Sequence, residues 1–431
     1  MTDTLFNIFW FRRDLRLDDN RALSEAVDSG LPIIPIFIFD SNILQELPAD
    51  DKRVSFIFDR ISLLNNELAQ FGSRLQVFEG KPADIFEQLS NNYSLHTVFA
   101  GTDYEPYAIK RDAEINLVLK RKGASLQLIS DQLVLSPGRV LSAANKPYTV
   151  FTPFSKAWKA ALVADDLAEY NFPKQKAHFY PAKARKIDMP SGFVYSKYQA
   201  VSTNLNENLV LNYAANRDFP ARKATSELSV HLRFGTMSIR KIYKQGAVLS
   251  ETWSNELIWR EFFMHILYFF PHVAKQSFRT QYDSLAWINN EEHFRRWCEG
   301  TTGYPLVDAG MRQLDETGYM HNRVRMVTAS FLAKHLLTDW RRGEAWFASK
   351  LMDFELSSNN GNWQWAAGTG CDAAPYFRIF NPMEQARKFD PQNEYIRRWI
   401  PEFGSSKYPT PIVDHKTARE RCLLEYGKLR G

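Results

Sequence analysis

The sequence predicts an α/β fold in which an amino-terminal, doubly wound, parallel five-stranded sheet is followed by an all-helical domain. Over residues 1–130 short apolar runs alternate with amphipathic stretches, as in a sheet whose parallel strands are joined by helices. From residue 200 onward apolar residues recur every three or four positions, which is typical of packed helices. A chain of 431 residues is also too long for one ordinary core. We therefore expect domains over 1–130 and 200–431, with 131–199 as the connector between them.

The elements of the first domain follow from its apolar runs. The predicted strands are 5–11, 32–39, 74–79, 96–101 and 125–130, and the predicted helices are 20–29, 52–71, 82–90 and 105–122. Ligands of such sheets bind beyond the carboxyl ends of the strands. The first strand is followed by FRRDLRLDDN and not by GxGxxG, so the sequence does not support a dinucleotide in this domain.

The rest of the chain divides into a connector and a series of helices. The connector contains the proline-punctuated stretch FPKQKAHFYPAKARKIDMP and has no sustained period, which favours a solvated surface segment. Helices are predicted over SNELIWREFFMHILYFF, AGMRQLDETGYMHNRVRMVTASFLAKHLL and GEAWFASKLM, where apolar residues recur at helical spacing.

Cysteine content and hydropathy exclude several classes of protein. Cys298, Cys371 and Cys422 lie far apart without paired spacing, so neither a disulfide framework nor a zinc site is indicated. No apolar run approaches the ~20 residues that cross a bilayer, and the amino terminus lacks a signal-peptide pattern. We therefore expect a soluble, cytoplasmic protein.

Charge is distributed unevenly along the chain. Residues 1–130 contain 14 Lys and Arg against 19 Asp and Glu, a balance of −5, whereas residues 131–431 contain 40 against 30, a balance of +10. The basic part is where a polyanion such as nucleic acid would bind. A surplus of this size is also common on a solvated surface, so charge alone leaves both interpretations open.

Residues 320–382 combine tryptophan, asparagine and arginine at an unusual density. The segment contains MHNRVRMVTASF, then DW, then FELSSNNGNWQWAAGTGCDAAPYFRIFNP. Without metal-ligand or nucleophile spacing, such residues suit stacking, hydrogen bonding and anion contact, although an aromatic helical core would look similar.

Five motifs in order resemble the photolyase/cryptochrome family. NGNWQWAAGTGCDAAPYFRIFNP resembles the flavin-binding signature of that family, and WFRRDLRLDDNRAL at 10–23 resembles its amino-terminal signature. ELIWREFF from Glu256, GYPLVDAGMRQL from Gly303 and MHNRVRM from Met320 follow the family order. The resemblance spans almost the whole chain and is closest to bacterial class I-type cyclobutane pyrimidine dimer photolyases. It implies an antenna-type first domain and a helical domain that binds FAD and DNA.

The resemblance assigns a substrate cavity to five residues. Glu256 and Trp259 are three apart, and Asn322 and Met326 four apart, so each pair shares a helix face. By resemblance these four line the pocket for a pyrimidine dimer, with Trp365 opposite Trp259. Read without the family, they are surface or core residues. His321 is one position away from the place where a six-four enzyme would be expected to carry histidine, which favours cyclobutane dimers.

Tryptophans and polar residues are assigned to electron transfer and to the flavin in the same way. Trp363 and Trp365 are two apart and point ~200° from one another on a helix, so they cannot share a role. The resemblance implies an electron route through Trp363, Trp340 and Trp287. Asn359 matches the position facing flavin N5, and its amide favours a repair enzyme over a cryptochrome. The other FAD contacts implied are Tyr213, Thr225, Ser226, Leu228, Ser229, Arg325, Asp353 and Glu355. Position 355 departs from the family pattern, because many bacterial relatives have aspartate there.

Two further sets of residues complete the expected site. The DNA phosphate contacts implied by the resemblance are Arg217, Arg323 and Arg378, and the antenna candidates are Asp40, Arg53, Asp103 and Glu105. The antenna could be a deazaflavin, a folate or a flavin, or could be missing. Arginines also suit surface carboxylates, and each antenna candidate could be an ordinary loop residue.

The resemblance implies light-dependent repair of ultraviolet-damaged DNA by a monomer without a metal or an obligate protein partner. Photoexcited reduced FAD would pass an electron to a flipped cyclobutane dimer, single- or double-stranded DNA being the substrate. The alternatives are a cryptochrome-like blue-light receptor, a six-four photolyase, a flavin reductase for small substrates, and a light-independent nucleic-acid-binding protein. The chain shows no HExxH, GxSxG or P-loop.

Overall fold

The structure is a computed structural model that describes residues 4–183, 185–199, 201–373 and 375–429. Its contacts divide the chain into two compact units. The sheet unit comprises Met1–Ser136, Leu162–Thr203 and Leu228–Gln245, and the helical unit comprises Pro137–Ala161, Asn204–Glu227 and Gly246–Gly431. Of the range expected to connect the domains, residues 162–183 and 185–199 therefore pack with the sheet unit and 137–161 with the helical unit.

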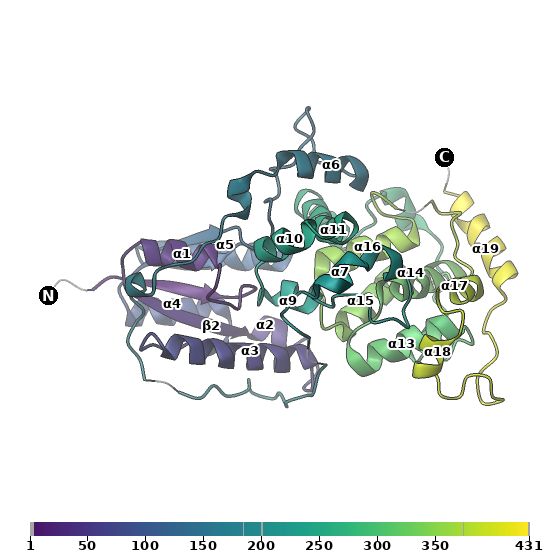
Figure 1. Cartoon of the computed structure of the whole chain (residues 1–431), viewed down its shortest axis with the longest axis horizontal. Coiled ribbons are helices and arrows are strands. Elements are labelled where there is room, and N and C mark those ends of the chain that lie inside the picture. Colours follow the sequence, from purple (N-terminus) through teal and green to yellow (C-terminus); the bar gives the residue numbers. More distant parts are fainter. Residues whose placement is uncertain (1–3, 184, 200, 374, 430–431) are drawn as a thin grey trace. The chain divides into compact units, whose positions relative to one another are not determined.

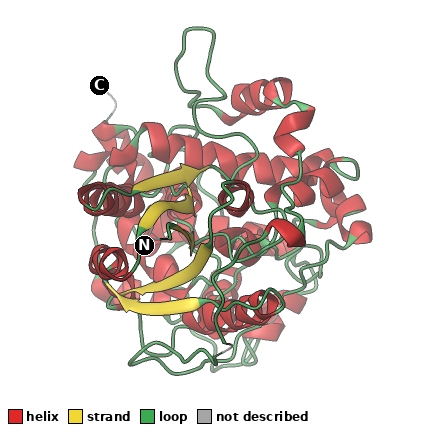
Figure 2. Ribbon diagram, turned by 90° about the vertical axis from the view of Figure 1, so that its left-hand side faces the viewer, coloured by secondary structure: helices red, strands yellow, loops and turns green. Residues whose placement is uncertain are grey.

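The sheet unit is built on five parallel strands, which confirms the predicted sheet. The strands are β1 (Phe6–Phe11), β2 (Ile33–Asp40), β3 (Gln76–Gly80), β4 (Leu95–Gly101) and β5 (Ser125–Ile129), in the order β3-β2-β1-β4-β5. The arrows of Figures 1 and 2 draw this sheet. Pro35 lies inside β2 but precedes Ile36, where pairing with β3 begins. Its missing N–H group is therefore tolerated.

The helices between these strands begin where the sequence provides caps. They are α1 (Arg21–Asp28), α2 (Ser41–Leu44), α3 (Lys52–Ala69), α4 (Pro82–Asn92) and α5 (Pro106–Arg121). Asn20 and Asp51 accept hydrogen bonds from backbone N–H groups in the first turns of α1 and α3, and proline starts α4 and α5. Because parallel crossovers are right-handed, α1 and α3 lie on one face of the sheet and α4 and α5 on the other.

Chain from beyond the sheet also packs into this unit. It contains the short helices η1 (Ala164–Leu167), η2 (Lys174–Lys176) and α9 (Ser229–Phe234), and most of α10 (Ile239–Ala247). Arg240 on α10 pairs with Asp19 at 2.8 Å and with Asp131 at 2.7 Å, and all three are buried. A buried ion network of this kind is expensive to break, because removing one partner leaves an uncompensated charge.

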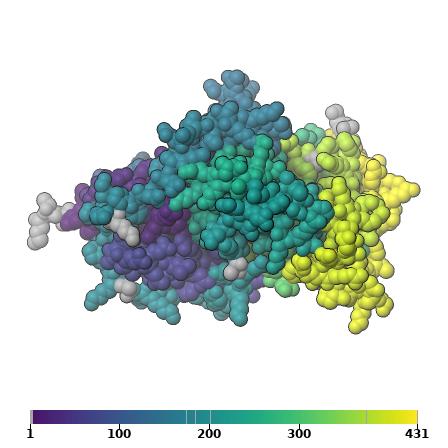
Figure 3. Space-filling model, viewed as in Figure 1, coloured from purple at the N-terminus to yellow at the C-terminus, as the bar shows by residue number. Residues whose placement is uncertain are grey.

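The helical unit contains the remaining helices. They are α6 (Phe151–Ala161), α7 (Glu207–Leu211), α8 (Tyr213–Asn216), α11 (Glu251–Phe269), η3 (Pro271–Ala274), η4 (Thr280–Ser284), α12 (Glu291–Cys298), α13 (Pro305–Thr317), α14 (Asn322–Ser330), the π-helical turn η5 (Phe331–His335), α15 (Trp340–Lys350), α16 (Leu356–Ala367), α17 (Pro382–Phe389), α18 (Glu394–Trp399) and α19 (His415–Gly427). The carboxy-terminal helices α17 to α19, yellow in Figure 3, reach the surface. Among the described helices, none is long and apolar enough to cross a membrane.

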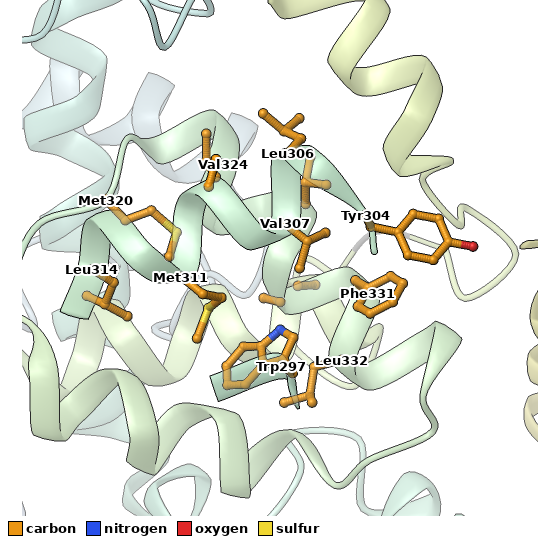
Figure 4. Close-up of a cluster of buried hydrophobic side chains, with 14 of the residues drawn as sticks. Trp297, Tyr304, Leu306, Val307, Met311, Leu314, Met320, Val324, Phe331 and Leu332 are labelled. Atoms are coloured by element: carbon orange, nitrogen blue, oxygen red, sulfur yellow. The ribbon is translucent and has the colours of Figure 1, made fainter. Parts of the chain in front are cut away.

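The core of the helical unit is a cluster of large side chains around Trp297. This indole is fully buried, and Met311 of α13 and Leu332 of η5 lie beside it (Figure 4). Leu314 of α13, Val324 of α14 and Phe331 of η5 belong to the same cluster. The indole N–H donates to the carbonyl of Thr328 at 3.2 Å, so its polar atom is satisfied. The same cluster includes Trp340 and Trp363, two of the residues expected to carry electrons.

Candidate active site

Glu256 and Trp259 lie on one face of α11, as their spacing predicts. Ser250 caps this helix by accepting a hydrogen bond from Trp253, and both site residues are half-buried. Arg217, which follows α8, donates from Nη1 to Glu256 Oε1. Burial raises the pKa of Glu256, while Arg217 opposes that shift. The site thus holds a carboxyl group whose proton is retained more readily than in water, beside an indole.

One face of Trp259 is covered by an aromatic ring that the sequence did not predict. Phe151, the first residue of α6, stacks on Trp259 with ring centroids 3.6 Å apart and planes inclined by 6°. The backbone N–H of Phe151 donates to Asp372 Oδ2 at 2.9 Å, which ties the start of α6 to the segment after α16. A planar ligand could therefore stack only against the remaining surface of Trp259 unless Phe151 moves.

The start of α14 carries a second group of expected site residues. His321 caps the helix, with Nδ1 accepting from the N–H of Arg323 at 3.2 Å, and burial lowers the pKa of His321 to about 4. Asn322 is exposed and Met326 half-buried. Arg323 binds Asp218 Oδ1 at 2.7 Å and points Nη1 at Met326 Sδ at 3.8 Å. His321 is thus neutral at physiological pH, and its Nδ1 caps α14.

Arg325 and Asp353 form the expected ion pair. Arg325 Nη2 donates to Asp353 Oδ2 at 3.0 Å, and its Nε donates to the carbonyl of Met320 at 2.7 Å. The other carboxylate oxygen, Asp353 Oδ1, is buried and has no hydrogen-bond partner among the described residues. A buried acceptor that lacks a donor is costly, so this oxygen fits a donor on a bound ligand.

Asn359 on α16 is held by a residue that the sequence analysis missed. Its Nδ2 donates to Oε1 of Glu344 at 2.7 Å and to the carbonyl of Glu344 at 3.1 Å. Burial raises the pKa of Glu344. Because both amide hydrogens point toward α15, the acceptor Oδ1 of Asn359 is the polar atom that remains for a ligand.

Glu355, at the start of α16, is also partnered. Arg260 Nη2 donates to Glu355 Oε1 at 3.0 Å, and Ser358 Oγ donates to Oε2 at 3.0 Å. Glu355 is buried, so both hydrogen bonds offset the cost of removing its charge from water. Arg260 directly follows Trp259, and this position in ELIWREFF was the signal that could have identified it.

The tryptophans of the expected electron route share one packed region. Trp363 and Trp340 are buried in the core cluster and Trp287 is partly buried against it. The Trp363 ring lies 5.0 Å from that of Phe347 and 6.0 Å from that of Trp297. Trp365 is half-buried, in keeping with the different roles expected for the two tryptophans of α16. Within the part of the chain that the structure describes, the indole N–H groups of Trp287, Trp340 and Trp363 have no hydrogen-bond partner.

The residues expected to meet a diphosphate fall on both sides of a unit boundary. Tyr213 begins α8, and Thr225 Oγ1 lies 3.3 Å from the hydroxyl of Tyr319; all three residues belong to the helical unit. Ser226 belongs to the same unit, whereas Leu228 and Ser229 open the α9 segment of the sheet unit.

The three arginines expected to contact DNA differ in their pairing. Arg217 and Arg323 bind the carboxylates of Glu256 and Asp218. Arg378 is exposed, and its guanidinium makes no hydrogen bond or ion pair within the described part of the chain. Arg378 is therefore the one of the three that can meet a phosphate without first releasing a carboxylate.

In the sheet unit, the antenna candidates are joined to protein partners. Asp40 accepts a hydrogen bond from the Tyr107 hydroxyl at 2.5 Å, and Arg53 pairs with Asp51. Asp103 and Glu105 lie at the carboxyl end of β4, where Arg13 binds them at 3.1 and 3.2 Å. These contacts stabilise the loops, and the antenna roles of the four residues stay a prediction.

Known protein families and relatives match both the amino-terminal and the helical part of this chain. A family model for DNA photolyase matches residues 7–174, and one for the FAD binding domain of DNA photolyase matches residues 253–407. Deoxyribodipyrimidine photo-lyases of Vibrio cholerae and Synechococcus are 38% and 37% identical over 98% of this chain, which covers 100% and 96% of their lengths.

Solved structures agree over the whole chain. A bacterial class III photolyase from Agrobacterium tumefaciens has a TM-score of 0.84 and 34% identity, with 100% of this chain and 98% of that chain covered. An archaeal photolyase from Sulfolobus tokodaii with two FAD molecules has a TM-score of 0.86 and 34% identity, with coverage of 98% and 100%. A cryptochrome of Synechocystis is 25% identical, with a TM-score of 0.85 and coverage of 99% and 100%. The chain belongs to the photolyase/cryptochrome family, with a FAD-binding domain in its helical part.

Proposed function

We propose that this protein is a deoxyribodipyrimidine photo-lyase that splits cyclobutane pyrimidine dimers in DNA under blue or near-ultraviolet light. The observation that carries the proposal is the carboxyl group of Glu256, held by Arg217 one helical turn from the half-buried indole of Trp259. An aromatic wall beside one hydrogen-bonding group suits a planar, carbonyl-rich ligand. Relatives with this name match the chain over nearly its full length.

The helical unit offers residues that fit a flavin. Asp353 presents a buried oxygen to which no described residue donates, and Arg325 beside it supplies a positive charge. Asn359, with both hydrogens committed to Glu344, presents an acceptor that suits a protonated N5. Fully reduced FAD bound there would supply light-driven donation of one electron to the dimer. The other proposed contacts are Tyr213, Thr225, Ser226, Leu228, Ser229 and Glu355.

The substrate side of the site has a different task. Glu256 donates a hydrogen bond to a pyrimidine carbonyl and stabilises negative charge on the dimer; its raised pKa favours the protonated form that can donate. Trp259 and Trp365 provide stacking surface, and Asn322 and Met326 complete the cavity. A damaged base pair is easier to unstack than an intact one, so flipping favours the lesion.

The electron route assigned to Trp363, Trp340 and Trp287 would reduce the flavin before repair. The two inner indoles are shielded from water in the core cluster, and Trp287 lies at its edge. The three indole N–H groups have no hydrogen-bond acceptor in residues 4–183, 185–199, 201–373 and 375–429, so oxidation of the inner two would leave the proton in place. We assign them to activation of the enzyme and not to splitting of the dimer.

The expected partner is ultraviolet-damaged DNA, single- or double-stranded. Arg217, Arg323 and Arg378 would contact its phosphates, so affinity should fall as the salt concentration rises. We expect a monomer that acts in the cytoplasm of a bacterial-type cell, at the nucleoid when bound. A second chromophore at Asp40, Arg53, Asp103 or Glu105 belongs to the proposal only as an antenna.

The test is repair of an oligonucleotide that contains one cis-syn thymine dimer by reduced protein, in blue light and in the dark. We expect repair in light only. Glu256→Ala should slow repair more than Glu256→Gln, because glutamine can still donate a hydrogen bond. Glu251→Gln is the matched control, since Glu251 lies on the same helix, is exposed and pairs with Lys159.

Each contrary outcome has a definite meaning. Repair of a six-four lesion but not of the dimer would refute the substrate. Purified protein without a flavin absorption spectrum would refute the enzyme. Repair of neither lesion by a flavin-containing protein would favour a blue-light receptor, the second candidate, which the similarity to the Synechocystis cryptochrome supports.

A further inference from the structure

A π-helical turn follows α14, and it buries a lysine and a histidine, Lys334 and His335. The turn η5 is marked by the hydrogen bond from Leu336 N–H to the carbonyl of Phe331, 3.1 Å long and five residues apart. Turns of this kind are rare in proteins, and those that occur are often found at functional sites. They leave Lys334 and His335 with exposed fractions of 1% and 0%.

The ammonium group of Lys334 binds a backbone carbonyl, not a carboxylate. Its Nζ donates to the carbonyl oxygen of Arg378 at 3.0 Å, which is its one hydrogen bond within the described residues. Burial lowers the pKa of Lys334 to about 8. A buried ammonium is costly for folding unless it is well paired, so stability alone does not account for a lysine here.

The acceptor belongs to a turn that presents Arg378 to solvent. Within it, Arg378 N–H donates to the carbonyl of Pro375 at 2.8 Å, and the Tyr376 ring stacks on Tyr426 of α19 with planes inclined by 5°. Tyr426 itself is fixed, because its hydroxyl donates to the carbonyl of Ala367 at 2.7 Å. The stack anchors one side of the turn, and Lys334 anchors the peptide of Arg378 itself.

We propose that Lys334 is a positioning residue for DNA binding, which holds the Arg378 carbonyl so that the exposed guanidinium meets a phosphate of the lesion-bearing strand. The inference rests on the proposed function, because it assumes that DNA is the ligand. It adds a residue that touches neither DNA nor flavin. Its effect passes entirely through Arg378, and this makes it separable from a general role in folding.

The test is a double-mutant cycle on DNA affinity. The dissociation constant for a dimer-containing oligonucleotide is measured for the flavin-loaded wild type, Lys334→Met, Arg378→Ala and the double variant. We expect each single change to weaken binding roughly 5- to 10-fold, as loss of one phosphate contact does, and the double variant to bind like Arg378→Ala. Lys416→Met, which removes an exposed lysine of α19, should stay within about 2-fold.

A second measurement separates positioning from a folding defect. The slope of log Kd against log salt should become shallower by about 1 in both single variants, because one phosphate contact is lost in each. The melting temperature of each variant is compared with that of the wild type. The decrease for Lys334→Met should be no larger than the decrease for the control Lys416→Met. Additive losses in the cycle, or an unchanged salt slope in Lys334→Met, would overturn the inference.

If Lys334→Met does not fold, the role of Lys334 can be tested in the wild type by measuring DNA affinity as a function of pH. The groups that face it are Arg378 from the turn, Cys422 from α19 and His335 from η5. Arginine stays charged, burial raises the pKa of Cys422 to about 12, and burial lowers that of His335 to about 3. Between pH 7 and 10, Lys334 is therefore the group of this set that titrates.

We expect wild-type affinity to fall more steeply above pH 8 than that of Arg378→Ala. Parallel pH profiles would overturn the inference. An Arg378→Ala variant that binds DNA as tightly as the wild type would also overturn it, since the positioned side chain would then make no DNA contact. Either result leaves the proposed function standing if the wild type repairs dimers in light, whereas failure of the wild type to bind or repair damaged DNA would remove the proposed function itself.

Discussion

Replacing Gly343 by alanine sets helix propensity against packing, and the structure decides which wins. Gly343 lies inside α15, where alanine is usually more stable than glycine by about 1 kcal/mol. A Cβ atom at this position would lie 2.2 Å from Cη2 of Trp363 and 2.5 Å from Cδ2 of Leu332. Ordinary contacts are about 3.5–4 Å, so the rings or the helix must shift by more than an ångström.

Overpacking of a close helix–helix contact costs about 1–3 kcal/mol. After the gain in propensity, we expect Gly343→Ala to lose about 1 kcal/mol, or roughly 2–4 °C in Tm for a unit of this size. The matched control is Gly427→Ala at the end of α19, where no atom of the described residues outside its own helix turn lies within 4 Å of the added methyl group. The assay is thermal unfolding followed by circular dichroism. A Gly343→Ala protein as stable as Gly427→Ala, or more stable, would refute the packing argument.

Two further predictions concern the flavin side of the site. Trp363→Phe should slow photoreduction of the oxidised flavin yet spare repair by chemically pre-reduced protein, because the indole is assigned to electron supply and not to the dimer; equal loss of both activities would contradict the route. Glu344→Gln should raise Tm at pH 7 and lose that advantage toward pH 4, measured by thermal scans at several pH values. Burial raises the pKa of Glu344 above its unfolded value, so its protonated form is the stable one, and the folded state is weakened as pH rises. A pH-independent difference would count against a raised pKa of Glu344.

Much of the fold could be predicted because its signals are local. Buried parallel strands are continuous apolar runs, and the five predicted runs became β1 to β5. The helices between them begin near Asn20 and Asp51 or at prolines, which are caps visible in the sequence. The assignment of residues 228–245 to the sheet unit was not visible, because it depends on long-range pairs such as Arg240 with Asp19.

The candidate site was predictable to the extent that its residues sit in motifs. Spacing alone showed that Glu256 and Trp259 share a face, and the structure places them so. Phe151 and Glu344 were missed because each meets its partner only when separate helices pack together. The partners are 108 residues apart for Phe151 and Trp259, and 15 apart for Glu344 and Asn359. Sequence patterns report periodicity along an element, whereas these contacts depend on how separate helices pack.

The pairing of the three arginines predicts how unequally they contribute to DNA affinity. Arg323 already binds Asp218 at 2.7 Å, so a phosphate must compete with a carboxylate for it, and the gain is the difference between two similar contacts. Arg378 has no such partner among the described residues and exchanges only water and counterions for the phosphate. Arg378→Ala should therefore weaken binding of damaged DNA several-fold more than Arg323→Ala, measured as Kd at one salt concentration. Equal losses would mean that Asp218 releases Arg323 at little cost, as a half-exposed ion pair worth about 0–1 kcal/mol could.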